Sequence, residues 1–460
     1  MNDPKTTTDH LESVEQDQKL DETQWPAQFD PILLRRVIRK VDWMVIPFIC
    51  ITYLITYIDK AMMGYAAVFG LKEDLHLKGT EYSWLGSMFY FGYLAFEYPS
   101  VFAMQKLSVS KWLSVNIFIW GGVTMALAAC THFQPFLGLR FVLGALESCS
   151  TPAYLLITAT WYTIEEQPIR IGWWSTFLGI ANAFGGLLAF AIGHIQGNLA
   201  SWQYQFIIIG AISSVWGIFM FFTLADGPST ARWLNAQEKY VAIHRLGPVH
   251  SGTRVSEIKR YQMWEALTDP KTWFFFLCGV CTQVVNGAAS NFGSLIIEGF
   301  GYSNLVTTLF QIPYGMVILV SNVSAMYIQR WLPGQKRCIV GAIYLTSTYT
   351  ASFAMIMSLI TANTGGTTKR SVVNAIFFIS YCVGNIVGPF AFKSDEAPQY
   401  TSGIIAMLVA YCVEIFLLLG FAVYAAYLNR TKDGITTTSG QTDTDVDQTD
   451  RENVHFRYSY

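Results

Sequence analysis

The sequence predicts an all-α polytopic membrane protein, and three observations support this fold class. The 460 residues are 52% hydrophobic and only 13% charged, about half the charge of an ordinary soluble domain. The apolar residues occur in blocks of about 20, the helix length that spans a bilayer core. Lysine and arginine gather in short clusters between these blocks. The blocks predict eleven spans, near residues 43–62, 82–103, 112–130, 136–161, 172–193, 204–225, 273–295, 306–328, 338–360, 371–392 and 401–428.

The basic clusters predict the orientation of the chain. Cations precede the first span and crowd the long link after the sixth, whereas the links at 131–135, 194–203 and 296–305 contain none. The positive-inside rule therefore places both termini and the central link in the cytoplasm. We expect a cytoplasmic tail at 1–41, a six-helix half at 42–225, a cytoplasmic loop at 226–272, a second half with five spans at 273–428 and a disordered cytoplasmic tail at 429–460.

Composition and motifs exclude several functions. The net charge of −2 and the scattered cations argue against a nucleic-acid partner. Cys278 and Cys281 form a C-x-x-C inside a span, without nearby histidine or aspartate, so buried apolar cysteines are a better interpretation than a metal site. The P-loop lysine motif of ATP-driven pumps is absent from the sequence. We expect no enzyme, no cofactor and no metal, with a proton gradient as the energy source.

The count of spans contains an inconsistency. Basic residues flank the ninth block on both sides, with Arg337 before it and Lys369 after it. A single helix cannot begin and end on the same side of a membrane. Residues 338–360 could form a re-entrant hairpin, a helix could be absent, or the last spans could insert with inverted topology. Six spans, a loop and five spans suggest a six-plus-six design that is one helix short.

Arg140 and Glu147 are the first candidate site residues. Ionisable side chains at membrane depth cost roughly 3 kcal/mol or more each, and they usually face a bundle interior or a cavity. Seven residues turn an α-helix by about 700°, so the two side chains share a face. A guanidinium suits capture of a carboxylate, and a carboxyl in low dielectric can load a proton near neutral pH. The alternative is a buried ion pair that only locks helices together.

The first span supplies further candidates. Tyr57 and Lys60 share a helical face, and Lys60 could add a second cation to the site. Alternatively, Lys60 reaches the membrane interface or pairs with Asp59 or Glu97. Asp59 points about 120° away from the Tyr57 and Lys60 face, so we expect it, with Glu97, to be a packing or gating charge.

Polar residues of the second half complete the predicted site. Gln283 and Asn286 lie on adjoining faces of the seventh span, and Asn385 forms a weaker candidate in the 371–392 block. Such side chains hydrogen-bond either a ligand or another helix. We expect them to contact substrate, with hydrogen bonds between helices as the alternative.

Several strings resemble a known family. They include YIDKAMMGYAAVFG, LRFVLGALESCSTPAYLLITATWY, ANTGGTTKRSVV and YCVGNIVGPFAFKSDEAPQY. From about Leu33 to Leu428 the chain resembles the anion:cation symporter family of the major facilitator superfamily, in particular its fungal allantoate permease branch. The resemblance implies two helical halves around a midplane substrate site. It also implies anion binding by Arg140 and coupling by Glu147, and Lys60 matches a position where related carriers have arginine.

The resemblance is incomplete in one interval. Relatives have two helices where this chain has only residues 338–360, so we expect about one helix to be missing near Leu345 and Thr346. We expect a monomeric, proton-coupled fungal importer of a small organic anion (allantoate, ureidosuccinate, a vitamin or a small peptide) that works by alternating access in the plasma membrane or, second, the vacuolar membrane. The alternatives are a metabolite exporter and a non-transporting sensor or defective gene product.

Overall fold

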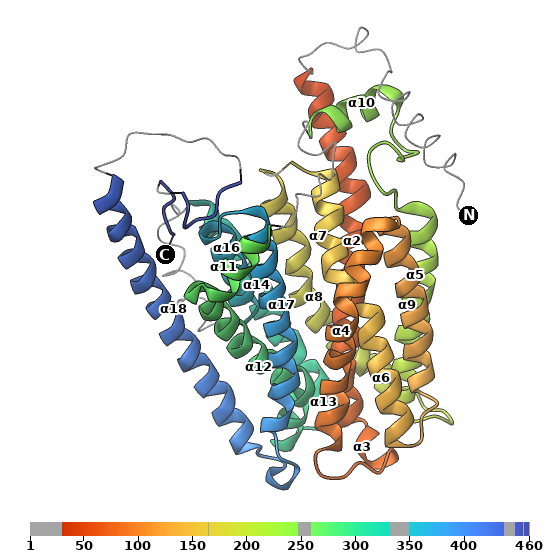
Figure 1. The fold of residues 1–460 in the computed structure, drawn as a ribbon. Helices are drawn as coiled ribbons and strands as arrows, with labels where there is room; N and C mark the ends of the chain where they lie inside the picture. The colour runs from red at the N-terminus through yellow and green to blue at the C-terminus, as the bar shows by residue number, and fades with distance from the viewer. Residues whose placement is uncertain are drawn as a thin grey trace, which may run out of the picture.

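In a computed structural model, residues 30–163, 165–246, 259–331, 349–436, 447–453 and 455–459 are described. These residues form helices, turns and short 3-10 segments, with no strand among them. Figure 1 shows two helical bundles side by side, one built from α2 to α9 and the other from α12 to α18. The predicted all-α fold is therefore confirmed.

The first bundle contains the six predicted spans of the amino-terminal half. Its first helix begins at Pro31, where the Asp30 side chain accepts a hydrogen bond from the Ile32 amide at 2.9 Å and caps the helix. The fourth span is interrupted at Ser148 and Cys149. The helices are α2 (Pro31–Val68), the short α3 (Leu71–Asp74), α4 (Glu81–Lys106), α5 (Val109–Leu127), α6 (Phe133–Glu147), α7 (Ser150–Trp161), α8 (Gln167–Gly193) and α9 (Ser201–Thr223).

Two short helices follow the first bundle, α10 (Ala236–His244) and α11 (Arg260–Thr268). The Asn235 amide donates to Glu238 at 3.0 Å, which caps the start of α10. Lys40 of α2 pairs with the same carboxylate at 2.7 Å. This contact ties α10 to the beginning of α2, at the upper end of the bundle in Figure 1.

The second bundle contains the remaining blocks. Its elements are α12 (Pro270–Gly299), α13 (Asn304–Leu309), α14 (Gln311–Trp331), α16 (Tyr349–Asn363), α17 (Thr367–Val387), η2 (Gly388–Ala391), η3 (Ser394–Glu396) and α18 (Thr401–Thr436). Within the described ranges, 8 helical segments are long and apolar enough to cross a membrane. Residues 332–348, including Leu345 and Thr346, lie outside the described residues, so the count of eleven spans stays a prediction.

Glycines set the distance between α4 and α6. A β-carbon at Gly144 would lie 1.8 Å from the Phe89 carbonyl oxygen, and one at Gly92 would lie 2.0 Å from the Phe141 carbonyl oxygen. The two backbones therefore cross closer than any larger residue allows. This crossing fixes the part of α6 that carries Glu147 against α4.

The two halves meet where α2 packs on α12, α4 on α17, and α8 on both α13 and α14. Near the end of the molecule that carries α3, two serine hydroxyls of α4 hydrogen-bond to backbone carbonyls of the second half. Ser83 donates to the Pro389 carbonyl at 3.0 Å, and Ser87 donates to the Ile386 carbonyl at 2.8 Å. These hydrogen bonds hold the halves together at that end.

The structure differs from the predicted disordered tail at 429–460. Residues up to Thr436 continue α18, and Asp450 is fully buried against the second bundle. The Asp450 carboxylate pairs with Lys369 at 2.7 Å and also with Lys271. The prediction was wrong for 447–453 and 455–459, because buried lysines of the helical half supply partners for an acidic segment that has few apolar residues of its own.

Candidate functional site

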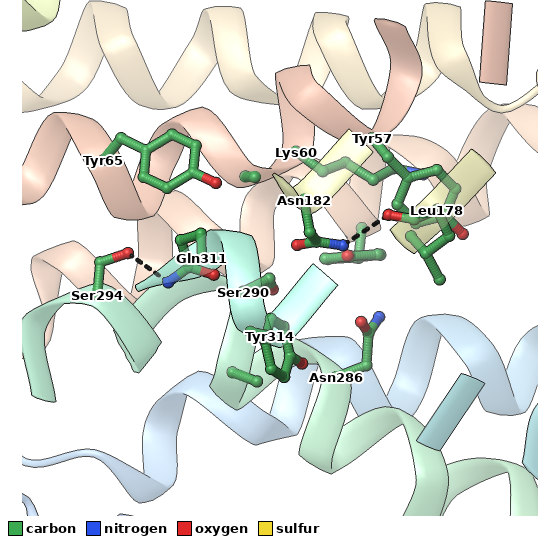
Figure 2. Close-up of a pocket in the computed structure, with 13 residues that line it drawn as sticks. Tyr57, Lys60, Tyr65, Leu178, Asn182, Asn286, Ser290, Ser294, Gln311 and Tyr314 are labelled. Carbon is green, nitrogen blue, oxygen red and sulfur yellow. Dashed lines mark hydrogen bonds between the residues drawn. The ribbon is translucent and has the colours of Figure 1, made fainter. Parts of the chain in front are cut away.

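A cavity lies between the two halves (Figure 2). In this conformation the cavity has a volume of only about 30 Å³, so its walls must move apart to admit a substrate. The walls come from α2, α4 and α8 on one side and from α12 and α14 on the other. Side chains with amide, hydroxyl and ammonium groups line it, so a polar ligand can find donors and acceptors there. The lining residues are Tyr57, Lys60, Ala61, Tyr65, Tyr90, Leu178, Asn182, Asn286, Ala289, Ser290, Ser294, Gln311 and Tyr314.

Lys60 connects this cavity to a buried carboxylate. Its ammonium nitrogen lies 2.7 Å from Oε1 of Glu147, whose side chain has no exposed surface, while 11% of the Lys60 side chain is exposed. The ammonium also lies 4.8 Å from the centre of the Tyr57 ring, a distance at which the ring face attracts a cation. Lys60 pairs with Glu147 rather than with Asp59 or Glu97, so the alternatives in which it pairs with those acids or reaches the interface are wrong.

Arg140 lies in the same buried region but outside the cavity lining. It is 4% exposed, and its Nε donates to the Leu85 carbonyl oxygen at 3.2 Å. Its guanidinium carbon lies 5.2 Å from the centre of the Phe89 ring. Among the described ion pairs, Glu147 is joined to Lys60 and not to Arg140. In this conformation the cation that faces the cavity is therefore Lys60.

The other two predicted charges lie away from the cavity. Asp59 is 1% exposed, and its Oδ2 accepts a hydrogen bond from the indole nitrogen of Trp120 at 2.7 Å. This contact joins α2 to α5, a helix that does not line the cavity, as a packing charge would. Glu97 is half-buried on α4 and does not line the cavity. The placement of both agrees with a structural rather than a substrate-binding position.

The three predicted amides bond one another. Asn286 donates to Gln283 at 3.0 Å and to Asn385 at 2.9 Å, and Asn385 donates to Gln283 at 2.9 Å. Gln283 and Asn385 are buried and join α12 to α17, which is the alternative considered from the sequence. Asn286 alone of the three lines the cavity.

Sequence reasoning missed several lining residues. Asn182 on α8 and Gln311 on α14 face the cavity, where Gln311 donates to Ser294 at 3.3 Å, as Figure 2 shows. Tyr65 is 2% exposed, and within the described part of the chain its hydroxyl has no hydrogen-bond partner. A polar residue inside an otherwise apolar block was the available signal. That signal does not show which face of a helix points toward the other half, so it could not assign these residues to the cavity.

Comparisons with known proteins agree with this architecture. A family model described as Major Facilitator Superfamily matches residues 49–420. The chain is 33% identical to the allantoate permease of Saccharomyces cerevisiae, over 97% of this chain and 90% of that protein. It is also 33% identical to the thiamine pathway transporter THI73 of the same yeast, over 92% of this chain and 86% of that protein.

Other similarities point the same way. An uncharacterised transporter of Schizosaccharomyces pombe is 36% identical over 92% of this chain and 86% of that protein. The structure of a D-xylose–proton symporter superposes with a TM-score of 0.61 at 14% identity, covering 82% of this chain and 96% of that one. The resemblance inferred from the sequence is confirmed: this chain belongs to the major facilitator superfamily, as a relative of fungal transporters that include the allantoate permease.

Proposed function

We propose that this protein is a secondary transporter that couples the movement of protons to uptake of a small organic anion by alternating access. The observation that carries the proposal is the Lys60–Glu147 ion pair, in which the lysine lines the cavity between the two halves. Cavities at the interface of two such halves are where transporters of this architecture bind substrate.

Charge balance gives the pair a mechanism. A proton that binds Glu147 removes its negative charge and releases Lys60. The freed ammonium can then bind the carboxylate of a substrate. The total charge of the site stays at zero when one proton and one carboxylate bind together, whereas either alone leaves an uncompensated charge at low dielectric. The pair therefore favours binding of one proton with each monocarboxylate.

The remaining lining residues support a substrate with several hydrogen-bonding groups. Asn182 and Tyr57 belong to the first half, and Asn286, Ser290 and Gln311 belong to the second. Carboxylates that also carry amide or urea groups, such as allantoate and ureidosuccinate, suit this set of donors and acceptors. Vitamins and small peptides remain in the same substrate class. The names of the yeast relatives, an allantoate permease and a thiamine pathway transporter, are consistent with this range.

Arg140 has a secondary role in this proposal. It lies behind Lys60 on α6, and its positive charge adds to the potential that attracts an anion into a low-dielectric site. Opening of the cavity on the α3 side requires the Ser83 and Ser87 hydrogen bonds to break. We place the working protein in the plasma membrane, with the vacuolar membrane second.

Uptake of labelled compounds tests the proposal. Cells that express the chain are offered allantoate, ureidosuccinate, nicotinate and a dipeptide at several external pH values. Lys60→Ala is expected to abolish uptake, whereas Lys393→Ala, at an exposed position, keeps it. Glu147→Gln mimics the protonated acid, so exchange of labelled for unlabelled substrate persists while the dependence of accumulation on the pH gradient falls by the share of one proton. An undiminished dependence in Glu147→Gln contradicts the mechanism.

A second comparison tests the span count. A chain with one helix inserted between Leu345 and Thr346 is assayed beside the chain as it stands. Equal uptake by both supports a functional transporter with the present sequence. Uptake by the longer chain alone identifies the present sequence as a defective product.

A further inference from the structure

The second half contains a buried carboxyl that the Lys60–Glu147 mechanism does not use. Glu414 on α18 has no exposed surface. Its Oε1 accepts hydrogen bonds from Thr282 of α12 at 2.7 Å and from Ser352 of α16 at 2.6 Å. Its Oε2 has no hydrogen-bond partner, and the acid makes no ion pair with any described residue. Three helices, which Figure 1 shows in the second bundle, thus meet at one acid.

When Glu414 is ionised, the Thr282 hydroxyl faces two acceptors with a single proton. The Thr282 hydroxyl lies 2.7 Å from Oε1 of Glu414 and 2.9 Å from the Cys278 carbonyl oxygen. A hydroxyl has one proton, so it cannot donate fully to both acceptors. If Glu414 itself carries a proton, it can donate to the Thr282 oxygen, and Thr282 then donates to Cys278. Ser352 still donates to Glu414, and each of the three protons then has one acceptor.

The surroundings also favour the neutral acid. Among the described residues, the titratable groups beside Glu414 are Cys281 on α12 and Tyr411 on α18, and both are uncharged near neutral pH. The described side chains of α16 near Ser352 are apolar. The next turn of α18 belongs to a small apolar core of Val285 and Ala410. An ionised carboxylate without a cation is strongly disfavoured in such a place.

We propose that Glu414 is a second proton-binding site of this transporter, loaded in the conformation described here and separate from the Lys60–Glu147 pair. The acid lies on α18 and its two hydrogen-bond partners lie on α12 and α16, so a relative movement of these helices changes the environment of the acid and its affinity for the proton. The binding of a proton by Glu414 stands on geometry alone. Its participation in transport rests on the proposed function, because α12 also lines the substrate cavity.

Infrared spectroscopy of the purified protein tests the binding of the proton. The carbonyl band of a protonated carboxylic acid is recorded at pH 7 for the unmodified chain, Glu414→Gln and Glu147→Gln. Loss of one such band in Glu414→Gln, with retention in Glu147→Gln, is the expected result. A spectrum that keeps the band in Glu414→Gln overturns the proposal. If that variant does not fold, Thr282→Val retains the acid but removes one hydrogen-bond partner, and the band is expected to shift.

Accumulation of substrate tests the role in transport. With the membrane potential collapsed, each coupled proton raises the accumulation ratio by about tenfold per unit of pH difference. With two coupled protons, the accumulation ratio of the unmodified chain is expected to rise about a hundredfold per unit of pH difference. With one coupled proton, the ratio for Glu414→Gln is expected to rise about tenfold. An unchanged dependence in Glu414→Gln identifies its proton as static and overturns the transport role. A failure of the Lys60–Glu147 mechanism can be told apart from a failure of this proposal. In that case uptake does not depend on Lys60 or Glu147, but the infrared band of protonated Glu414 is still present.

Discussion

Each half buries a carboxyl at membrane depth, Glu147 in the first and Glu414 in the second, and the two are stabilised in different ways. Glu147 in the first half has an ammonium partner at 2.7 Å, whereas Glu414 in the second half has two hydroxyl donors and no cation among the described residues. A charged pair is sensitive to loss of either partner, while a neutral hydrogen-bonded acid tolerates a neutral substitute. The comparison therefore predicts very different responses to equivalent mutations.

Removal of the cation in the first half is expected to have the largest effect. Lys60→Met leaves Glu147 buried without a counter-ion, which typically costs about 3–5 kcal/mol. We expect a large drop in the thermal unfolding midpoint of the detergent-purified protein. The double variant Lys60→Met/Glu147→Gln recovers most of that stability, since no charge is then left unpaired. A single variant as stable as the unmodified chain would show that Glu147 is not ionised, and the contrast between the halves would disappear.

The close approach of α4 and α6 at Gly144, which positions Glu147, is expected to give the next largest effect. Gly144→Ala puts a methyl group where the Phe89 carbonyl lies, and we expect destabilisation of about 1–3 kcal/mol or more from the forced separation of α4 and α6. Gly138→Ala on the same helix is the matched control, because no atom lies within 4 Å of its added carbon. Thermal unfolding of both variants measures the difference. Equal midpoints would contradict the close crossing.

The tail gives the second half an ionised contact of its own. Burial alone would raise the pKa of Asp450, but the charges of Lys271 and Lys369 outweigh it and lower the pKa from 3.8 to about 2. Because the folded pKa lies below the ordinary value, the stabilisation is complete above about pH 4 and is lost as the pH falls toward 2.

Asp450→Asn is expected to cost about 1–3 kcal/mol at pH 7, because Lys369 keeps its pair with Asp269 at 2.8 Å while one charge partner is lost. Proteolysis of the tail under native conditions measures the loosening. Asp395→Asn, at an exposed position, is the control. Identical cleavage of the two variants would show that Asp450 does not anchor the tail.

Glu414→Gln is expected to have the smallest effect on stability, below about 1 kcal/mol, because glutamine is neutral and of similar size. Its amide can still donate to Thr282 and accept from Ser352. Glu414→Ala removes the acceptor and leaves a space, so its unfolding midpoint falls further. A glutamine variant as unstable as Lys60→Met would indicate an ionised Glu414.

The sequence predicted the helices well because their signal is local. Ten of the eleven apolar blocks coincide with described helices, and the ninth is described only from Tyr349. The site was harder to predict, because side chains far apart in the chain form it. Lys60 and Glu147 were both recognised as candidates, yet their pairing depends on how α2 packs against the broken fourth span.

Two further features show the limit of pattern reasoning. Glu414 is the single charged residue in the block 401–428, a signal that was present and overlooked. Lys369 was interpreted as a marker of orientation, but it is 1% exposed and pairs with Asp450. Composition classified the tail correctly as polar. It could not show that the helical half holds buried cations for it.

The seating of the last described residues has a practical consequence for handling this protein. Tyr458 is 3% exposed, and the Ser459 amide donates to the Asn363 side chain at 2.7 Å. A fluorescent reporter fused close behind Ser459 would pull on this contact and loosen the base of α16. Reporters for trafficking and purification handles therefore belong ahead of Asp30, which caps the first described helix.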